Sequence, residues 1–364
     1  MYSEFKLEAY LTNGIDKIVK SAFKASLKNL KECLYIAKFT LDCKRAAVIR
    51  KNYLKKGKHI PAFLICSITK SCNLHCKGCY DRENNLRQEQ RGKEILSVTE
   101  WRRIFHEASQ IGISFILVAG GEPFIRKEVI EAAADYKKIM FPIFTNGTLF
   151  DENYFKLFYK NRNLLPVLSI EGEEEFTDAR RGVGIYSNLL HTMEKMKEKG
   201  IFFGVSITVT RENLLNVTND SFLSEIYQRG CKAAIFVEHV PVDQSTKDLT
   251  LSEKNREELD RKLRRLRLQY MDMIIVSFPG DEKTSGGCIA AGRGFFHINA
   301  NGNAEPCPFS PYSDTNIREC TLVGALNSPL FKKLASNDLL LREHQGGCVL
   351  FEQEEEVKKI ISGN

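Results

Sequence analysis

Six short apolar runs, separated by amphipathic segments of helical length, dictate the architecture that this chain can adopt. The runs are continuous and rich in β-branched residues, and they occupy residues 63–69, 114–120, 141–145, 166–170, 202–209 and 233–240. The intervening segments predict helices over residues 97–112, 126–138, 151–160, 185–199 and 221–229. Continuous apolar strands that alternate with helices indicate a parallel sheet. We therefore expect an α/β fold, a complete or partial (β/α)6 TIM-like barrel with its chemistry at the carboxyl ends of the strands.

Changes in composition divide the 364 residues into four parts. We predict a basic helical segment over 1–60, the barrel over 61–245, a helical linker with a barrel-edge strand over 246–286, and a small cysteine-rich subdomain over 287–364. Residues 1–60 hold 14 Lys and Arg against five Asp and Glu. Such a segment could attract an acidic peptide, an anionic membrane surface or nucleic acid. Its apolar residues at helical spacing favour helices packed on the barrel, with their lysines in solvent.

The eleven cysteines need an explanation other than disulfide bonds. The first residues, "MYSEFKLEAY", lack the basic and apolar regions of a secretory signal, and no apolar run approaches the roughly 20 residues of a membrane span. We therefore expect no transmembrane helix and a cytoplasmic location. Because that compartment keeps thiols reduced, the cysteines indicate metal or redox chemistry.

Three of these cysteines, Cys72, Cys76 and Cys79, form a C-x3-C-x2-C loop directly after the first predicted strand. Thiolates bind soft metals and iron–sulfur clusters, and a cubane cluster ordinarily takes four of them. A structural zinc site is the alternative, but it needs a fourth ligand, and His75 is awkwardly close to Cys76 for a tetrahedral cage. A metal centre with an open position is what catalysis requires.

With this loop the chain resembles the radical SAM enzymes, which carry C-x3-C-x2-C after the first strand of a partial (β/α)6 barrel and an aromatic residue after it, here Tyr80. The resemblance implies that the three cysteines ligate a 4Fe-4S cluster whose fourth iron binds S-adenosylmethionine. Reductive cleavage would then give a 5'-deoxyadenosyl radical that abstracts hydrogen from a substrate. The cofactors supply the difficult chemistry, and the protein supplies orientation and exclusion of water.

Further motifs at successive strand ends strengthen the resemblance. "GGEP" after the second strand is similar to the family's site for the methionine amino group, and its glycines allow a close backbone approach to a ligand. Glu171 stands where many relatives have Asp, which lengthens the acid by one methylene. By resemblance, the residues expected to bind the cofactor are Tyr80, Gly120, Gly121, Glu122, Pro123, Asn146, Ser169, Glu171, Arg181 and Val209.

The last part of the chain holds four widely spaced cysteines, Cys288, Cys307, Cys320 and Cys348, and a predicted hairpin with Asn301 and Gly302 in its turn. The spacing alone fits a closed zinc site as well as a second cluster. The segment resembles the SPASM or twitch extension of radical SAM enzymes, which implies an iron–sulfur subdomain with one auxiliary 4Fe-4S cluster held by these four residues. If one of them is a core thiol, that cluster would have an open iron.

Substrate chemistry is predicted from position alone. Glu238 and His239, at the end of the sixth strand, are the candidate catalytic residues, and an ion pair is the alternative for them. Asp178, Tyr186 and His297 are weaker candidates. The resemblance implies a peptide or small polar substrate and a flavodoxin- or ferredoxin-type electron donor.

A different class of protein also accounts for the cysteines: a zinc-stapled binding protein whose basic N-terminal segment engages nucleic acid. Such binding would be strongly salt-dependent. The basic stretch lacks interleaved aromatic residues and any RNA-binding signature, so we consider nucleic acid an unlikely partner.

Overall fold

The computed structural model describes residues 7–27, 29–87, 94–242, 244–279, 287–336, 338–342 and 348–362. Residues 1–6 of the predicted basic segment and 280–286 of the predicted linker lie outside the described residues. Within the described part of the chain, no helix is long and apolar enough to cross a membrane.

A nine-stranded sheet forms the centre of the molecule, in the order β7-β6-β5-β4-β3-β2-β1-β8-β9. Every neighbouring pair from β7 to β8 is parallel, and only β8 and β9 pair antiparallel. The predicted partial barrel is therefore confirmed, with β7 added beyond the sixth strand. The strands are β1 (Phe63–Ser67), β2 (Phe115–Ala119), β3 (Phe141–Thr145), β4 (Leu164–Ser169), β5 (Gly204–Val209), β6 (Ala233–Glu238), β7 (Ile274–Phe278), β8 (His297–Ile298) and β9 (Ala304–Glu305).

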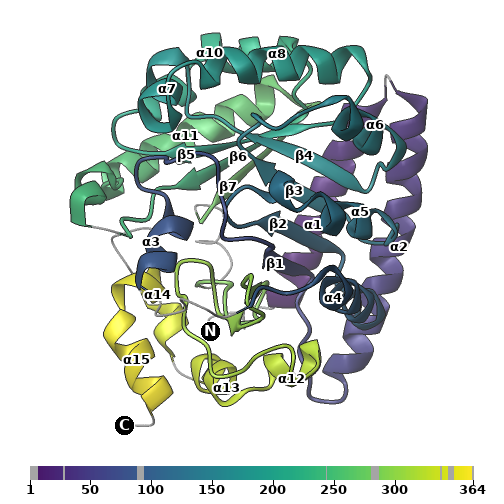
Figure 1. The fold of residues 1–364 in the computed structure, drawn as a ribbon, viewed down its shortest axis with the longest axis vertical. Helices are drawn as coiled ribbons and strands as arrows, with labels where there is room; N and C mark the ends of the chain where they lie inside the picture. The colour runs from purple at the N-terminus through teal and green to yellow at the C-terminus, as the bar shows by residue number, and fades with distance from the viewer. Residues whose placement is uncertain are drawn as a thin grey trace, which may run out of the picture.

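Helices between the strands cover one face of the sheet (Figure 1). The alternate residues Leu64 and Cys66 of β1 pack into the main hydrophobic cluster together with Trp101 and Phe105 of the first covering helix. That helix begins with the capping box predicted from Ser97 and Glu100. The covering elements are α4 (Val98–Ile111), the 3-10 turn η1 (Pro123–Arg126), α5 (Lys127–Ala134), α6 (Glu152–Lys160), α7 (Glu174–Arg181), α8 (Ile185–Glu198), α9 (Leu214–Val217), α10 (Asp220–Gln228) and α11 (Glu253–Gln269).

Two long N-terminal helices, α1 (Leu7–Ser26) and α2 (Leu30–Leu54), close the amino-terminal end of the barrel. Phe39 of α2 packs edge-on against Phe115, whose ring stacks on Phe63, and both partners are the first residues of their strands. Other strand starts in the same cluster are Leu165 and Ile274. The interpretation of this segment as helices packed on the barrel is therefore confirmed.

The C-terminal part of the chain lies at the β1 edge of the sheet and next to the short helix α3 (Tyr80–Arg87) (Figure 1). β8 pairs with β1, and the predicted turn at Asn301 and Gly302 joins β8 to β9. Val240, Val242 and Phe278 pack into one hydrophobic cluster with this part of the chain. Its helical elements are α12 (Leu322–Leu326), α13 (Pro329–Ser336), the 3-10 turn η4 (Asp338–Leu341), α14 (Val349–Glu352) and α15 (Glu354–Ser362).

Candidate functional site

The three-cysteine loop connects the carboxyl end of β1 to α3. Its thiols interact electrostatically with one another: burial, and then the neighbouring Glu122, Cys76 and Cys79, raise the pKa of Cys72 against a backbone hydrogen bond from Leu74. Burial also raises the pKa of Cys79. A raised pKa favours the neutral thiol, and a bound cation would favour the thiolate instead.

Two glycines lock the loop after β2 against the segment that leads into Cys72. The Gly121 amide donates to the Thr69 carbonyl at 2.9 Å, and the Glu122 amide donates to the Ser71 carbonyl at 2.8 Å. A Cβ on Gly120 would lie 2.4 Å from the Thr69 oxygen, and one on Gly121 would lie 2.2 Å from the Ser71 oxygen. The sequence predicted a close approach to a ligand at these glycines, whereas the close neighbour in the structure is the backbone before the cysteines.

Glu122 joins the ends of β2 and β3. Its buried carboxylate accepts hydrogen bonds from the Thr145 hydroxyl at 2.8 Å, the Asn146 amide at 2.8 Å and the Phe124 amide at 3.0 Å. Burial raises its pKa against these donors. The Asn146 side chain donates to Asn73 in the cysteine loop at 2.9 Å, so the third strand also contacts that loop. Pro123 begins the 3-10 turn η1.

Glu171 and Arg181, which the sequence predicted as separate ligands, form an ion pair. The buried Glu171 carboxylate accepts from Arg181 Nε at 3.0 Å and from the Thr208 amide at 2.9 Å. Burial opposes the charge of Arg181, but Glu171 and the nearby sulfur atoms of Cys76 and Cys79 outweigh it and raise the arginine pKa. Arg181 Nη1 lies 4.0 Å from Cys76 Sγ, so this pair connects the fourth strand to the cysteine loop.

Arg180 is a site residue that sequence reasoning missed. Its guanidinium also pairs with Glu171, its Nε donates to the Lys77 carbonyl at 3.1 Å, and its own carbonyl accepts from the Lys77 amide at 3.0 Å. Arg180 therefore holds the cysteine loop through the backbone of Lys77. The only signal in the sequence was its position next to Arg181, since α7 carries both arginines in its last turn.

Four more residues lie around this group. Ser169 is the half-buried last residue of β4, and Val209 is the buried last residue of β5. Asn213 donates through its side chain to the carbonyls of Glu171 and Thr208, which ties the ends of β4 and β5 together. Tyr80 begins α3 and packs edge-on against Phe309, 5.1 Å between ring centres, so it lies between the cysteine loop and the C-terminal part.

The two predicted catalytic residues at the end of β6 contact different parts of the fold. Glu238 is buried and forms an ion pair with Arg256 of α11, with 2.8 Å between Oε2 and Nε. The structure thus places Glu238 beneath a covering helix instead of in the expected substrate cavity. The ring of His239 lies beside Gly78, where an added Cβ would come within 3.2 Å of its Cε1, and its Nε2 lies 3.2 Å from the Thr246 carbonyl. Of the two, His239 is the one next to the cysteine loop.

Three of the four C-terminal cysteines gather in one place. Burial, then the adjacent thiol of Cys348 and the charge of Cys288, raise the pKa of Cys307. These three belong to or pack on the same hydrophobic cluster. Cys320 packs on the main core cluster, and its Sγ lies 3.5 Å from both the Thr315 hydroxyl and the Asn316 carbonyl. The expected four-cysteine set is therefore corrected to three that meet and one that is held elsewhere.

Among the described residues, no three His, Cys, Asp or Glu side chains converge around a point as the ligands of a single metal ion would. A four-iron cluster makes a different demand, because each cysteine binds its own iron.

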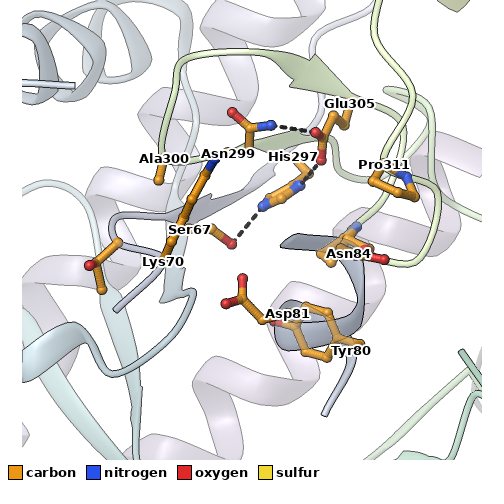
Figure 2. Close-up of a pocket in the computed structure, with 12 residues that line it drawn as sticks. Ser67, Lys70, Tyr80, Asp81, Asn84, His297, Asn299, Ala300, Glu305 and Pro311 are labelled. Atoms are coloured by element: carbon orange, nitrogen blue, oxygen red, sulfur yellow. Dashed lines mark hydrogen bonds and ion pairs between the residues drawn. The ribbon is translucent and has the colours of Figure 1, made fainter. Parts of the chain in front are cut away.

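A polar pocket separates α3 from the hairpin of β8 and β9 (Figure 2). Inside it, Ser67 Oγ lies 2.8 Å from His297 Nε2, and His297 Nδ1 lies 2.7 Å from Glu305 Oε2. His297 was only a weak candidate from the sequence, and Ser67 and Glu305 were missed. The lining residues are Ser67, Thr69, Lys70, Tyr80, Asp81, Asn84, His297, Asn299, Ala300, Glu305, Pro308 and Pro311.

A strand-end cysteine loop is braced by a Gly-Gly-Glu-Pro turn and by a buried arginine. The family model described as the Radical SAM superfamily matches residues 66–220, which include every one of these elements. Over this part of the chain, the protein is similar to radical SAM enzymes.

Curated relatives cover different shares of the chain. Fe-coproporphyrin III synthase of Methanosarcina barkeri is 28% identical over 46% of this chain, which spans 41% of that protein. PqqA peptide cyclase of Granulibacter bethesdensis is 24% identical over 76% of this chain and 77% of its own length. AdoMet-dependent heme synthase of Methanosarcina barkeri is 26% identical over 83% of this chain and 90% of its own length.

Solved structures share the fold beyond the barrel. Streptococcus suis SuiB bound to precursor peptide SuiA matches with a TM-score of 0.66 and 17% identity, over 86% of this chain and 77% of that one. The structure of anSMEcpe with bound AdoMet and Cp18Cys peptide matches with a TM-score of 0.60 and 16% identity, over 83% of this chain and 97% of that one. At these identities the likeness establishes the fold.

Proposed function

We propose that Cys72, Cys76 and Cys79 hold a 4Fe-4S cluster that binds S-adenosylmethionine. The observation that carries this assignment is the contact between Arg181 and Cys76, because it joins the buried Glu171 pair at the end of β4 to the thiol loop after β1. The glycine turn of Gly120 and Gly121 supports it from the side of β2. When bound, the cluster and S-adenosylmethionine supply reductive cleavage to a 5'-deoxyadenosyl radical that removes hydrogen from the substrate.

The roles of the surrounding residues follow from their chemistry. The Glu122 carboxylate, held by Thr145 and Asn146, accepts from the amino group of the bound sulfonium ligand. Ser169 and Arg181 provide donors for its hydroxyl and carboxylate groups. Glu171 keeps Arg181 charged and oriented, and the backbone near Val209 borders the adenine.

We propose that Cys288, Cys307 and Cys348 hold one auxiliary 4Fe-4S cluster. Three thiols that gather in one cluster of the C-terminal part support this ligand set, and the separate packing of Cys320 removes the fourth. One iron of that cluster would then have no cysteine ligand. An electron donor of the flavodoxin or ferredoxin type would reduce the enzyme.

The proposed substrate is a peptide. Similarity to PqqA peptide cyclase over three quarters of the chain and the shared fold with SuiB, solved with its precursor peptide, support it. A tetrapyrrole is the second candidate, because the heme synthase relative aligns over the larger share of both chains.

Deuterium transfer distinguishes these substrates. The reconstituted, reduced enzyme is incubated with S-adenosylmethionine and, separately, with a perdeuterated peptide fraction from cells that encode the chain and with perdeuterated iron coproporphyrin III. We expect deuterium in 5'-deoxyadenosine from the peptide fraction. If only the tetrapyrrole transferred deuterium, it would replace the peptide as the proposed substrate. Absence of 5'-deoxyadenosine from every reaction would overturn the assignment of the cluster loop.

A further inference from the structure

Three buried side chains form a hydrogen-bonded chain along one wall of the polar pocket. Ser67 ends β1, His297 begins β8 and Glu305 ends β9, and their exposed fractions are 3%, 4% and 2%. The chain runs from Ser67 Oγ to His297 Nε2 at 2.8 Å and from His297 Nδ1 to Glu305 Oε2 at 2.7 Å. Asn299 extends it, because its Nδ2 donates to Glu305 Oε1 at 2.5 Å. Figure 2 shows these contacts in sequence.

An ionised Glu305 would accept from Asn299 on one oxygen and from His297 on the other, which would place a proton on His297 Nδ1. The remaining nitrogen, Nε2, then has a lone pair and accepts the hydroxyl proton of Ser67. The Ser67 oxygen keeps its own lone pairs to accept one further hydrogen bond.

The pocket in which this chain ends is suited to a polar occupant. Lys70 lies on its wall three residues after Ser67, and Tyr80 and Asp81 of α3 lie across from His297 (Figure 2). Charged and titratable groups thus face His297 from the segment after β1, from α3 and from β9. The same α3 follows directly on Cys79, so an occupant of the pocket lies next to the cysteine loop.

We propose that Ser67, His297 and Glu305 form a proton relay that deprotonates the peptide substrate in this pocket. The inference rests on the proposed function. A substrate side chain with an O–H, S–H or N–H group gives its proton to Ser67 Oγ, while the Ser67 proton moves to His297 Nε2. One bond to hydrogen breaks and one forms at each step, which leaves a substrate anion and an imidazolium stabilised by Glu305. Ser67 is the group that touches substrate, and His297 and Glu305 are positioning residues.

A purely structural role for the same network makes different predictions. Buried hydrogen bonds between β1 and β8 also fix the alignment of these two strands, in which His297 lies opposite Ile65. If that were their only role, variants would lose stability, but the ratio of product to 5'-deoxyadenosine would stay the same.

Nitrogen NMR of the protein labelled with 15N-histidine tests the proton positions without substrate. The His297→Gln variant assigns the resonances of that ring. We expect the neutral form with hydrogen on Nδ1 in the wild-type protein. Hydrogen on Nε2, or on both nitrogens, would overturn the relay, because the ring could then accept no proton from Ser67.

The reconstituted enzyme tests the proton transfer itself, with the perdeuterated peptide fraction as probe. The variants are His297→Gln and Glu305→Gln, and His59→Gln is the matched control because its ring contacts the Arg293 carbonyl at 2.7 Å outside the pocket. Positioned general bases contribute about 100-fold or more. We expect His297→Gln to lower product formed per 5'-deoxyadenosine by about 100-fold while deuterium transfer and the apparent KM stay near wild type.

The outcomes separate the two proposals. An unchanged ratio of product to 5'-deoxyadenosine in His297→Gln overturns the relay, as does an equal loss of deuterium transfer and product, which is the result expected of a structural network. A wild-type enzyme that takes no deuterium from peptides overturns the proposed substrate, and the relay with it.

Discussion

Cys76 is the residue at which the parts of the site meet. Its thiol lies 4.0 Å from Arg181 Nη1, and Arg181 is held by Glu171 at the end of β4. A substitution at position 76 would therefore remove one proposed cluster ligand and the sulfur neighbour of a buried guanidinium at once.

Replacement of Cys76 by Ala is expected to abolish both the cluster at this loop and 5'-deoxyadenosine formation, because three thiolates are already one fewer than a cubane usually has. Iron analysis and chromatography of reaction mixtures measure the two effects. Cys33→Ser, at a half-buried position of α2, is the control and should leave both unchanged. Cleavage at the wild-type rate in Cys76→Ala would contradict the ligand assignment.

Position in the sequence predicted some residues of the site and misled at others. Gly120, Gly121 and Glu122 lie where their motif indicated, since a strand end is read directly from the apolar run before it. Glu238 was predicted as a catalytic residue with an ion pair as the alternative, and it forms an ion pair with Arg256 under α11. A strand with apolar residues on both faces has no alternation to reveal which way its last side chain points.

At the scale of elements, the start of α4 connects the barrel to the C-terminal part. Glu100 completes the capping box of this helix and also pairs with Arg318, whose Nε lies 2.5 Å from its Oε1. Burial alone would raise the pKa of Glu100, but Arg318 and the Ser97 donors outweigh it and lower the pKa to about 2. The folded protein therefore stabilises the ionised form of Glu100 more than its protonated form.

The Glu100→Gln variant should be less stable than wild type by about 1 kcal/mol at neutral pH, a value that allows for partial exposure of the pair. A lowered folded-state pKa stabilises the fold above the ordinary value of 4.5, and this contribution disappears as the pH falls through about 2. Urea unfolding at several pH values measures the difference. Glu212→Gln, at an exposed position after β5, is the control. A difference independent of pH would contradict the ion-pair explanation.

The N-terminal helices contribute to stability through a few aromatic contacts with strand starts. Phe39 is 1% exposed and packs edge-on against Phe115. We expect Phe39→Ala to lower the free energy of unfolding by about 3 kcal/mol, as large buried side chains do. Leu41→Ala on the same helix, 55% exposed, should change it by less than about 0.5 kcal/mol. Equal effects of the two changes in urea unfolding would contradict the packing described for α2.

At the scale of the whole molecule, the C-terminal part brings a second group of thiols to the edge of the barrel. The sequence predicted four ligands because wide spacing does not say which cysteines meet in the fold. Packing decides it: Cys307 and Cys348 share one hydrophobic cluster, whereas Cys320 is held beside Asn316 in another. The hairpin turn, in contrast, followed from local residues, and Gly302 has the positive φ of 89° that such a turn requires.

The three-cysteine set predicts different outcomes for two similar substitutions. Cys348→Ala should lower the iron content by about four atoms per chain, and Cys320→Ala should leave it unchanged, because the fourth cysteine would not be a ligand. Iron and sulfide analysis of anaerobically reconstituted protein measures both. Iron loss in Cys320→Ala equal to that in Cys348→Ala would restore the four-cysteine set.

The covering of the strand starts by α1 and α2 affects how substrate and product reach and leave the site. With the strand starts covered by Phe39 and its neighbours, the cysteine loop lies at the opposite, carboxyl end of the strands. In the proposed reaction, substrate would enter and product would leave at that end, so the order in which they exchange would be part of the catalytic cycle.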